Sequence, residues 1–390
     1  MPIDPDANRS TGAWVPCPDC GHGRGRRHCQ PNHNCPTNGS AQKGNAVVTT
    51  ISLGGPAGEI AISPDGNRIY VIVADSVKVI SRLHHIVATY RIGPHPKSLL
   101  VSADGTHVYV TGYDGSTSVI CTADNTMKTF VLERSNAEVV SPHGDYIYTC
   151  HSGIAGDTGG SWISAVNAEG ETVAVVPVDR RATDMALSPD GRRLYVSSRT
   201  GSSHLDSRGL ISVIDTCTSR VVDRIAVEVA PDTLSMSRNG TRLYATHYHG
   251  NAFSIIDPRT WDVSRWLFGD APIAIAVSPD DSLACVTNLH SVTVLNVAAN
   301  IVKSTAIGAL PRKTCLSGDG KRAYIIDFDR KTILAFDTAD NVVVGNADVD
   351  GQPQAMVLGP DDEFLYLTDY RNGVVTVIAT TLLKRTAQEK

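Results

Sequence analysis

Four cysteines and three histidines crowd into the first 35 residues and form the densest set of metal-ligating side chains in the chain. Thiolate and imidazole are suitable Zn²⁺ ligands, and a Cys-x-x-Cys pair can clamp one ion. The segment therefore predicts a site for zinc or another divalent metal, with a disordered tail carrying incidental thiols, or a set of disulfides, as the alternatives. The candidate ligands are Cys17, Cys20, Cys29 and Cys35, with His22, His28 and His33 among them.

A second polar set recurs at intervals of 39 to 42 residues: His247, Asn288, Asp327 and Asp369. Imidazole, amide and carboxylate groups that converge on one site could bind a divalent cation or supply a general base beside a polarising group. In that interpretation His247 is the base and the two aspartates are ligands. The alternative is that these short polar side chains only cap loop backbone, as they do at turns.

Further candidates for ligand binding are His151, His204 and His249, together with Asn288. His151 opens the stretch HSGIAGDTGGSW, and His204 lies in SRTGSSHLDSRG, which begins at Ser198. Both stretches lengthen their part of the chain, and long loops often form lids or recognition walls. Solvated loop residues are the alternative identity for each of these side chains.

Other common chemistries have no matching motif. Gly-x-Ser-x-Gly is absent from any strand-to-helix context, so no Ser-His-Asp triad is assigned. The Gly-rich stretch at residues 21–25 neither follows a strand nor opens a helix, unlike the loops that bind dinucleotides or phosphate. We therefore expect no nucleotide cofactor.

The elements that must position these residues come from an internal repeat. A phrase of the form apolar-Ser-Pro-Asp-Gly-x-x-apolar-Tyr-Val occurs eight times, with substitutions and spacings of 39 to 49 residues. Pro presets the first turn residue, Asp bonds the turn backbone and Gly takes the positive φ that closes a hairpin. The copies begin at Ile62, Val101, Val140, Leu187, Met236, Val277, Leu316 and Leu358.

Each copy predicts two strands around its turn, and two further β-rich runs follow, as in residues 210–215 and 221–227. Four strands per 40 residues is the spacing of a β-propeller blade. The last copy supplies only three strands, whereas residues 46–53 precede the first copy without a hairpin of their own. We predict that this N-terminal strand completes the last blade, because pairing there leaves no open sheet edge.

The predicted fold is thus all-β: a single eight-bladed β-propeller, with seven blades as the alternative count, and a Cys/His-rich N-terminal extension. The expected boundaries are 1–44 for the extension, flexible or metal-bound, 45–382 for the propeller and 383–390 for a C-terminal tail. Aligning the copies places one residue at the end of each second strand, on one face of the ring. These residues are Val73, Gly112, His151, Ser198, His247, Asn288, Asp327 and Asp369.

The repeat resembles that of the YVTN family. Residues 109–112 (YVTG), 285–288 (CVTN) and 366–369 (YLTD) are similar to its Tyr-Val-Thr-Asn signature, and SVIDTCTSRVVDRIAV from Ser212 resembles the second half of its repeat. The resemblance covers residues 46 to 380 and implies the propeller fold. Propellers of this type resemble lactonases, streptogramin lyases, surface-layer proteins and interaction platforms, so the resemblance leaves activity open.

Composition and charge argue against some classes of partner. The formal net charge is −5, which gives no global attraction to nucleic acid or anionic lipid, and no membrane span or signal peptide is visible. Five of the nine cysteines are scattered through the repeats, which favours a reducing cytoplasm over a disulfide framework. We expect a monomeric, cytoplasmic protein with no nucleic-acid partner.

Two functions follow from these patterns. The first is a binding platform whose loop face holds a small ligand or a protein, associated with metal through the N-terminal segment. The second is a metal-dependent lactonase- or lyase-like enzyme that acts on a small polar molecule at the channel mouth, with His247, Asp327 and Asp369 as its catalytic residues. The sequence leaves open whether the protein is an enzyme.

Overall fold

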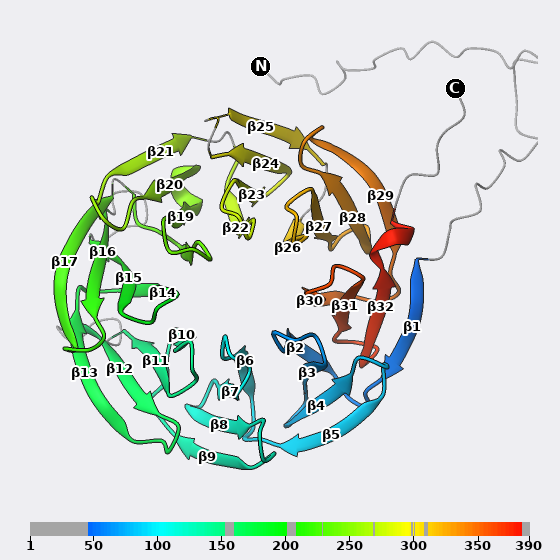
Figure 1. Cartoon of the computed structure of the whole chain (residues 1–390), viewed down its shortest axis with the longest axis horizontal. Helices are drawn as coiled ribbons and strands as arrows, with labels where there is room; N and C mark the ends of the chain where they lie inside the picture. Colours follow the sequence, from blue (N-terminus) through cyan, green and yellow to red (C-terminus); the bar gives the residue numbers. More distant parts are fainter. Residues whose placement is uncertain are drawn as a thin grey trace, which may run out of the picture. The chain divides into compact units, whose positions relative to one another are not determined.

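A computed structural model describes residues 46–152, 160–200, 208–227, 229–267, 270–297, 299, 301–307 and 311–383. The chain divides into two units, Met1–Gly44 and Asn45–Lys390, and all described residues belong to the second. That unit is an all-β ring of eight four-stranded antiparallel sheets around a central opening (Figure 1). The prediction of eight blades is confirmed, and the alternative count of seven blades is wrong.

Blade 1 contains β2 (Ala57–Ile62), β3 (Arg68–Val73), β4 (Ser76–Ser81) and β5 (Ile86–Arg91), and blade 2 contains β6 (Pro96–Val101), β7 (His107–Gly112), β8 (Ser116–Cys121) and β9 (Met127–Val131). Blade 3 contains β10 (Ala137–Val140), β11 (Tyr146–His151), β12 (Ser161–Asn167) and β13 (Thr172–Val178), and blade 4 contains β14 (Ala182–Leu187), β15 (Arg193–Thr200), β16 (Arg208–Asp215) and β17 (Arg220–Val227).

Blade 5 contains β18 (Thr233–Met236), β19 (Leu243–His247), β20 (Ala252–Ile256) and β21 (Val263–Leu267), and blade 6 contains β22 (Pro272–Val277), β23 (Leu283–Asn288), β24 (Ser291–Asn296) and β25 (Ile301–Ala306). Blade 7 contains β26 (Pro311–Leu316), β27 (Arg322–Asp327), β28 (Thr332–Asp337) and β29 (Val342–Asp348). Blade 8 contains β30 (Pro353–Leu358), β31 (Phe364–Asp369), β32 (Val374–Ala379) and β1 (Val47–Ser52). Two single-turn 3₁₀ helices, η1 (Tyr248–Gly250) and η2 (Thr380–Leu382), complete the described elements.

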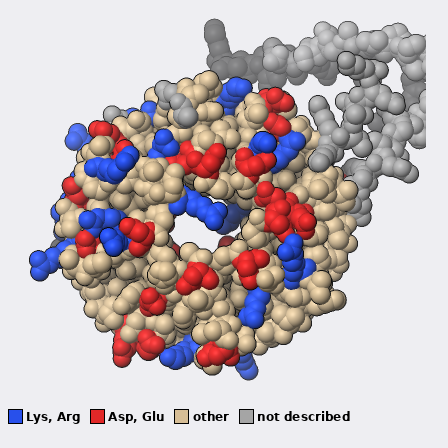
Figure 2. Space-filling view, in the orientation of Figure 1, with Lys and Arg blue, Asp and Glu red and all other residues tan. Residues whose placement is uncertain are grey.

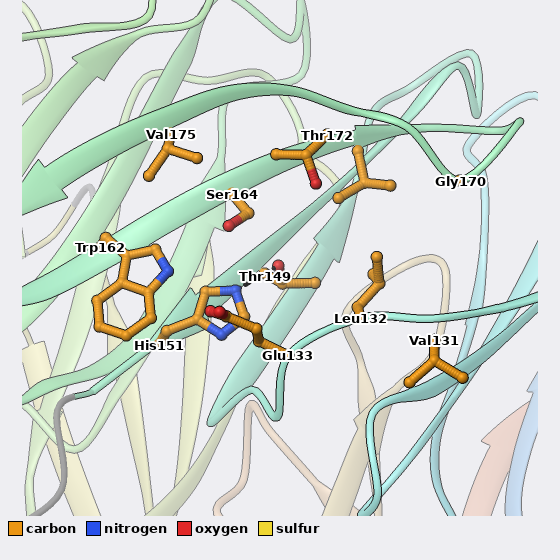
Figure 3. Close-up of a pocket in the computed structure, with 11 residues that line it drawn as sticks. Val131, Leu132, Glu133, Thr149, His151, Trp162, Ser164, Gly170, Thr172 and Val175 are labelled. Atoms are coloured by element: carbon orange, nitrogen blue, oxygen red, sulfur yellow. Dashed lines mark hydrogen bonds between the residues drawn. The ribbon is translucent and has the colours of Figure 1, made fainter.

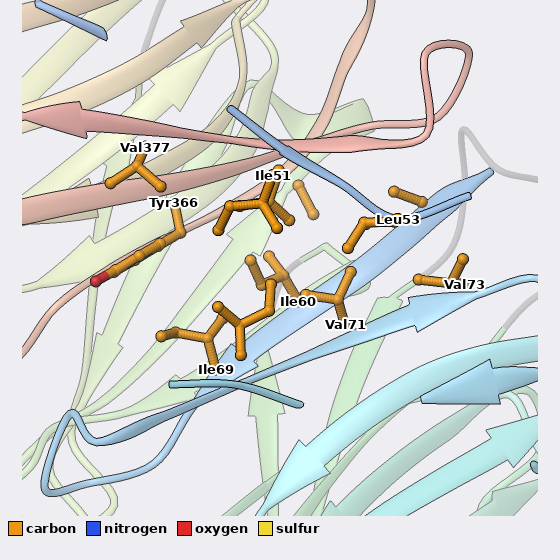
Figure 4. Close-up of a cluster of buried hydrophobic side chains, with 12 residues drawn as sticks. Ile51, Leu53, Ile60, Ile69, Val71, Val73, Tyr366 and Val377 are labelled. Atoms are coloured by element: carbon orange, nitrogen blue, oxygen red, sulfur yellow. The ribbon is translucent and has the colours of Figure 1, made fainter. Parts of the chain in front are cut away.

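Blade 8 is composite, because its outermost strand comes from the beginning of the described chain. β1 pairs antiparallel with β32, and the Leu53 N–H donates to the Gly373 carbonyl at 2.8 Å. Ile51 and Leu53 then pack with Tyr366 of blade 8 and with Ile60 and Ile69 of blade 1 (Figure 4). The two ends of the propeller are therefore held together by a β-ladder and by buried apolar surface.

The hydrophobic core is divided among the eight interfaces between neighbouring blades. Each of eight clusters of buried apolar side chains joins strands of two adjacent blades. Side chains of a strand alternate between its two faces, so each second strand contributes to both interfaces. In β7, for example, Val108 and Val110 pack toward blade 1, whereas Tyr109 packs toward blade 3.

The hairpin turn of each repeat is held by its own polar residues. In the first repeat the Ser63 hydroxyl donates to Asp65 Oδ1 at 2.5 Å, and Ser63 Oγ accepts the Arg68 N–H at 3.0 Å. Asp65 Oδ1 also accepts the Asn67 N–H at 3.0 Å, and Gly66 has φ of 72°. The Ser-Pro-Asp-Gly phrase is thus a turn whose hydrogen bonds are satisfied locally, with Gly at the left-handed position.

The same turns also hold neighbouring blades together. Gly105 lies so close to Pro64 of the preceding repeat that a Cβ on it would come within 3.1 Å of Pro64 Cδ. Gly191, Gly240 and Gly66 approach the prolines of the preceding turns in the same way. The repeated tyrosine adds a polar link, since the Tyr109 hydroxyl donates to the Gly144 carbonyl of blade 3 at 2.7 Å.

Two repeats carry Asp where the others carry Gly, and the carboxylates link blades. Asp281 has φ of 60°, is buried, and accepts hydrogen bonds from Thr241, Arg242 and Tyr244 of blade 5 at 2.6 to 2.8 Å. Asp362, also at φ of 60°, accepts the Gly318 N–H of blade 7. Asp tolerates the left-handed conformation better than most residues, so the turn is kept while an inter-blade bond is added.

We predict that Asp281→Asn lowers the free energy of unfolding by about 2 kcal/mol, because it weakens a buried charge-assisted network while keeping the side chain's shape. Urea denaturation at neutral pH measures the change. Asp319→Asn is the matched control, and we expect it to change the free energy of unfolding little. Blade 5 already has Asn239 at the equivalent turn position. Asn239 makes the same bonds to Ser237 and Thr241 that Asp319 makes to Ser317 and Lys321. Equal losses in the two variants would contradict the assigned role of Asp281.

Candidate functional site

One face of the ring carries the turns between second and third strands and the loops that lead from one blade into the next. This arrangement follows from four antiparallel strands in sequence order within each blade. Seven of the eight aligned positions are the last residue of a second strand, and Ser198 lies two residues before the end of β15. Figure 2 shows acidic and basic side chains interspersed around the central opening on the face drawn.

His247 and Asn288 are buried between blades rather than exposed at the channel mouth. His247 Nε2 lies 2.8 Å from Ser254 Oγ, and Asn288 Nδ2 donates to Ser291 and Thr293 of its own blade at 3.0 and 2.8 Å. Burial lowers the pKa of His247, although the backbone carbonyl of Ala230 acts in the opposite direction. Among the described residues, His247 Nδ1 and Asn288 Oδ1 have no hydrogen-bond partner.

Asp327 and Asp369 hold the turns that follow their strands. Asp327 Oδ1 accepts the Arg330 N–H at 3.0 Å, and its Oδ2 lies 3.6 Å from the Arg330 guanidinium. Asp369 accepts the N–H groups of Arg371 and Asn372 with Oδ1, and the Gln352 N–H with Oδ2. Both carboxylates are buried, so their geometry is that of turn caps.

These polar residues are not brought together. Within the described part of the chain, no three or more His, Cys, Asp and Glu side chains group closely enough to hold a metal ion. His249 lies in η1, is exposed and has its ring edge-on to exposed Tyr248, whereas His247 is buried. His204 and the four N-terminal cysteines, Cys17, Cys20, Cys29 and Cys35, lie outside the described residues.

A pocket of about 430 Å³ does lie on this face, where the inner strands of blades 8, 1 and 2 begin. We call it the mouth pocket; its lining includes Glu59, Asp75, Lys97, Tyr113, Gln354 and Tyr370. The two tyrosines are 67% and 56% exposed, which is unusual for aromatic rings in a folded domain. The pocket therefore combines two accessible rings with carboxylate and amide groups.

The two tyrosines occupy the same position in their repeats, one residue after the end of the second strand. In several blades the N–H of this residue donates to the loop that enters the blade, as Tyr113 does to the His95 carbonyl at 2.9 Å. Side chains at this position extend from an anchored turn. Aligning it would have shown four aromatic residues in eight repeats, a signal that our sequence analysis missed: Tyr113, Tyr248, Phe328 and Tyr370.

Most charges near the pocket are already paired. Lys97 Nζ lies 2.9 Å from Glu138 Oε1 and also donates to the carbonyls of Ser135 and Asn136. Glu59 lies 3.9 Å from Lys313 of blade 7. Both partners of the Lys97–Glu138 pair are largely buried, so this pair joins the inner strands of blades 2 and 3 instead of offering a free cation.

Asp184 is the one carboxyl group among the described residues whose pKa is raised to about 6. It lies on β14, and burial is the main cause, reinforced by the negative charge of Glu138. The Leu234 N–H of blade 5, which donates to Asp184 Oδ2 at 2.8 Å, opposes the shift. Asp184 thus links blades 4 and 5, and burial in the folded protein favours its protonated form.

We predict that Asp184→Asn stabilises the protein at neutral pH. The folded pKa lies above the ordinary value of 3.8, so the favourable contribution of Asp184 is complete below pH 3.8 and is lost as pH rises through about 6. Asn does not ionise, so the variant avoids that loss. Its gain in the free energy of unfolding over the wild type should grow between these two pH values and reach a constant value of about 1–3 kcal/mol at higher pH. Urea denaturation across pH measures it, with exposed Asp340→Asn as control; a gain independent of pH would contradict the assignment.

A second pocket, of about 530 Å³, lies between blades 2 and 3 and contains His151 (Figure 3). His151 is buried; its Nδ1 lies 2.9 Å from the Arg134 carbonyl and its Nε2 lies 2.9 Å from Thr149 Oγ1. Its ring stacks on Trp162 with centroids 5.3 Å apart and an interplanar angle of 15°. Of the four residues predicted to bind ligand, His151 lines this pocket, whereas Asn288 and His249 line neither of the two pockets and His204 lies outside the described residues.

Comparison with known proteins places the chain in a family. It is 30% identical to the seven-bladed β-propeller protein Rv1057 of Mycobacterium tuberculosis over 88% of both chains. It is 24% identical to the uncharacterized protein YncE of Salmonella typhi, over 40% of this chain and 46% of that one. No protein-family model matches the chain.

A solved structure of Kuenenia stuttgartiensis hydrazine synthase superposes with a TM-score of 0.56 at 19% identity, covering 85% of this chain and 97% of that chain. At this identity the likeness shows the propeller fold alone. The chain therefore belongs to the family of β-propeller proteins that includes the mycobacterial Rv1057. That relative is named as seven-bladed, whereas this chain forms eight four-stranded sheets.

Among the described residues, no helix is long and apolar enough to cross a membrane. All five cysteines of the described residues are free thiols, and burial raises the pKa of Cys150 and Cys285 to about 12. A thiol with so high a pKa is protonated at neutral pH and reacts slowly. We therefore assign no chemistry to these two cysteines.

Proposed function

We propose that this propeller is a binding platform whose mouth pocket holds a small polar molecule carrying hydroxyl or amide groups. The observation behind this proposal is the pair of exposed tyrosines, Tyr113 and Tyr370, which line one pocket together with Glu59, Asp75 and Gln354. Ligand pockets commonly combine aromatic walls with a few polar groups that fix orientation. Tyrosine rings offer apolar contact together with a hydroxyl group that can donate or accept a hydrogen bond.

The proposal favours binding over metal-dependent lactonase- or lyase-like catalysis. The side chains of His247, Asp327 and Asp369 are buried in separate blades, and both carboxylates already accept hydrogen bonds from their turns. A catalytic role for them stays a prediction of the sequence, as do the zinc site at Cys17, Cys20, Cys29 and Cys35, the YVTN membership, the cytoplasmic location and the monomeric state.

We predict that Tyr370→Ala and Tyr113→Ala each weaken the binding of hydroxylated ligands by about tenfold, since a lost aromatic contact is worth roughly 0.5–1.5 kcal/mol beyond its buried area. Saturation-transfer NMR with saccharides, polyols and N-acetylated amino sugars measures binding to the full chain. Tyr146→Ala is the control, because Tyr146 is exposed at the start of β11, on the opposite face.

Three results would count against the proposal. Saturation transfer that is unchanged in Tyr370→Ala would remove the mouth pocket as the binding site. Binding by none of these compounds would count against a hydroxyl- or amide-bearing ligand. An equal loss in Tyr146→Ala would show that the effect comes from a general change in the fold.

A further inference from the structure

The pocket between blades 2 and 3, which we call the inter-blade pocket, interrupts the apolar packing that joins other blades. The cluster at this interface has four fully buried members, Tyr109, Val119, Ile147 and Val166. Beyond Ile147 and Val166, the same face of blade 3 continues with Thr149 and His151 on β11, and with Ser164 and Trp162 on β12. These four side chains line the pocket.

The sequence of blade 3 departs from the other repeats at two of these places. The position of Thr149 is apolar in every other blade, as Val71, Val110, Val196, Ala245, Val286, Ile325 and Leu367. The cross-strand partner of His151 is Trp162, whereas the partner of the equivalent His247 is Ala252. The Thr149 hydroxyl therefore replaces an apolar group, and the Trp162 indole stands where other blades carry smaller side chains.

The aromatic wall of this pocket is held in place by its hydrogen bonds. A backbone carbonyl can only accept, so the Arg134 carbonyl assigns the proton to His151 Nδ1, and Nε2 then accepts from the Thr149 hydroxyl. Both ring nitrogens of His151 are thus satisfied by the protein itself. Trp162 stacks on this fixed ring and remains partly exposed toward the pocket (Figure 3).

The charge of the lining is negative. Among the described residues that line the pocket, the one charged residue is Glu133, which follows β9 and has an exposed side chain. The adjacent Arg134 meets His151 through its carbonyl group and is not part of the lining. An indole face and a carboxylate within one pocket attract a cation by the ring quadrupole and by charge.

We propose that the inter-blade pocket binds a small organic cation, an alkylammonium or quaternary ammonium group, with Trp162 as its aromatic contact and Glu133 as its counter-charge. The volume of about 530 Å³ accommodates such a molecule with its aliphatic part against Leu132 and Val175. Thr149 and Ser164 supply hydroxyl groups on the same wall of blade 3 as Trp162. This site is separate from the mouth pocket and does not depend on the function proposed there.

The test uses choline and its neutral isostere 3,3-dimethylbutan-1-ol as probes, titrated into the full-length protein by calorimetry and by saturation-transfer NMR. We expect choline to bind and the neutral alcohol to bind at least about fivefold more weakly, since a cation–π contact is worth roughly 1 kcal/mol or more. Equal affinity for the two probes, or no binding of choline, would overturn the proposal.

Variants locate the site. Glu133→Gln keeps the shape of an exposed side chain and should weaken choline binding about fivefold, while Trp162→Leu should weaken it at least as much. Glu363→Gln, an exposed carboxylate in blade 8, is the control and should leave binding unchanged. Choline affinity that is unaltered in Glu133→Gln and Trp162→Leu would rule out this pocket even if choline binds elsewhere.

Discussion

The contact between the hairpin turn of one blade and the turn of the next is the constraint on which the rest of the ring depends. A proline from one turn reaches the glycine of the next, as Pro64 reaches Gly105, where a Cβ would come within 3.1 Å of Pro64 Cδ. Where Asp281 replaces the glycine, its carboxylate bonds the preceding blade instead. Because the same contact recurs, each blade is placed by its neighbour, and the interface cores form between them.

This constraint explains why the most conspicuous polar residues do not form one site. The end of each second strand must hold the following turn against the loop that enters the blade, and Asp327 and Asp369 do so with their carboxylates. Those side chains face an interface, where they are buried. The next residue along the chain emerges from the held turn, and there the exposed rings of Tyr113 and Tyr370 reach the mouth pocket.

The two pockets have different physical origins. The mouth pocket is made by loops, so its lining varies between blades without disturbing the core. The inter-blade pocket is lined by Thr149, His151, Ser164 and Trp162, which continue the blade 3 face beyond the apolar pair Ile147 and Val166. The ring can tolerate incomplete apolar packing between blades 2 and 3, because seven other interfaces and the β1–β32 ladder keep the blades in position.

The sequence by itself determined the fold, because a repeated turn phrase fixes local structure and its count fixes the number of blades. Eight copies, with three strands in the last one, were sufficient to predict eight blades. Only the tertiary structure decided which side chains meet. The spacing of His247, Asp327 and Asp369 gave their place in the repeat, but whether a side chain faces the channel or an interface depends on the neighbouring blade. For the same reason Tyr370, Trp162 and Glu133, which resemble ordinary loop and strand residues in the sequence, became the candidate binding groups once the blades were packed together.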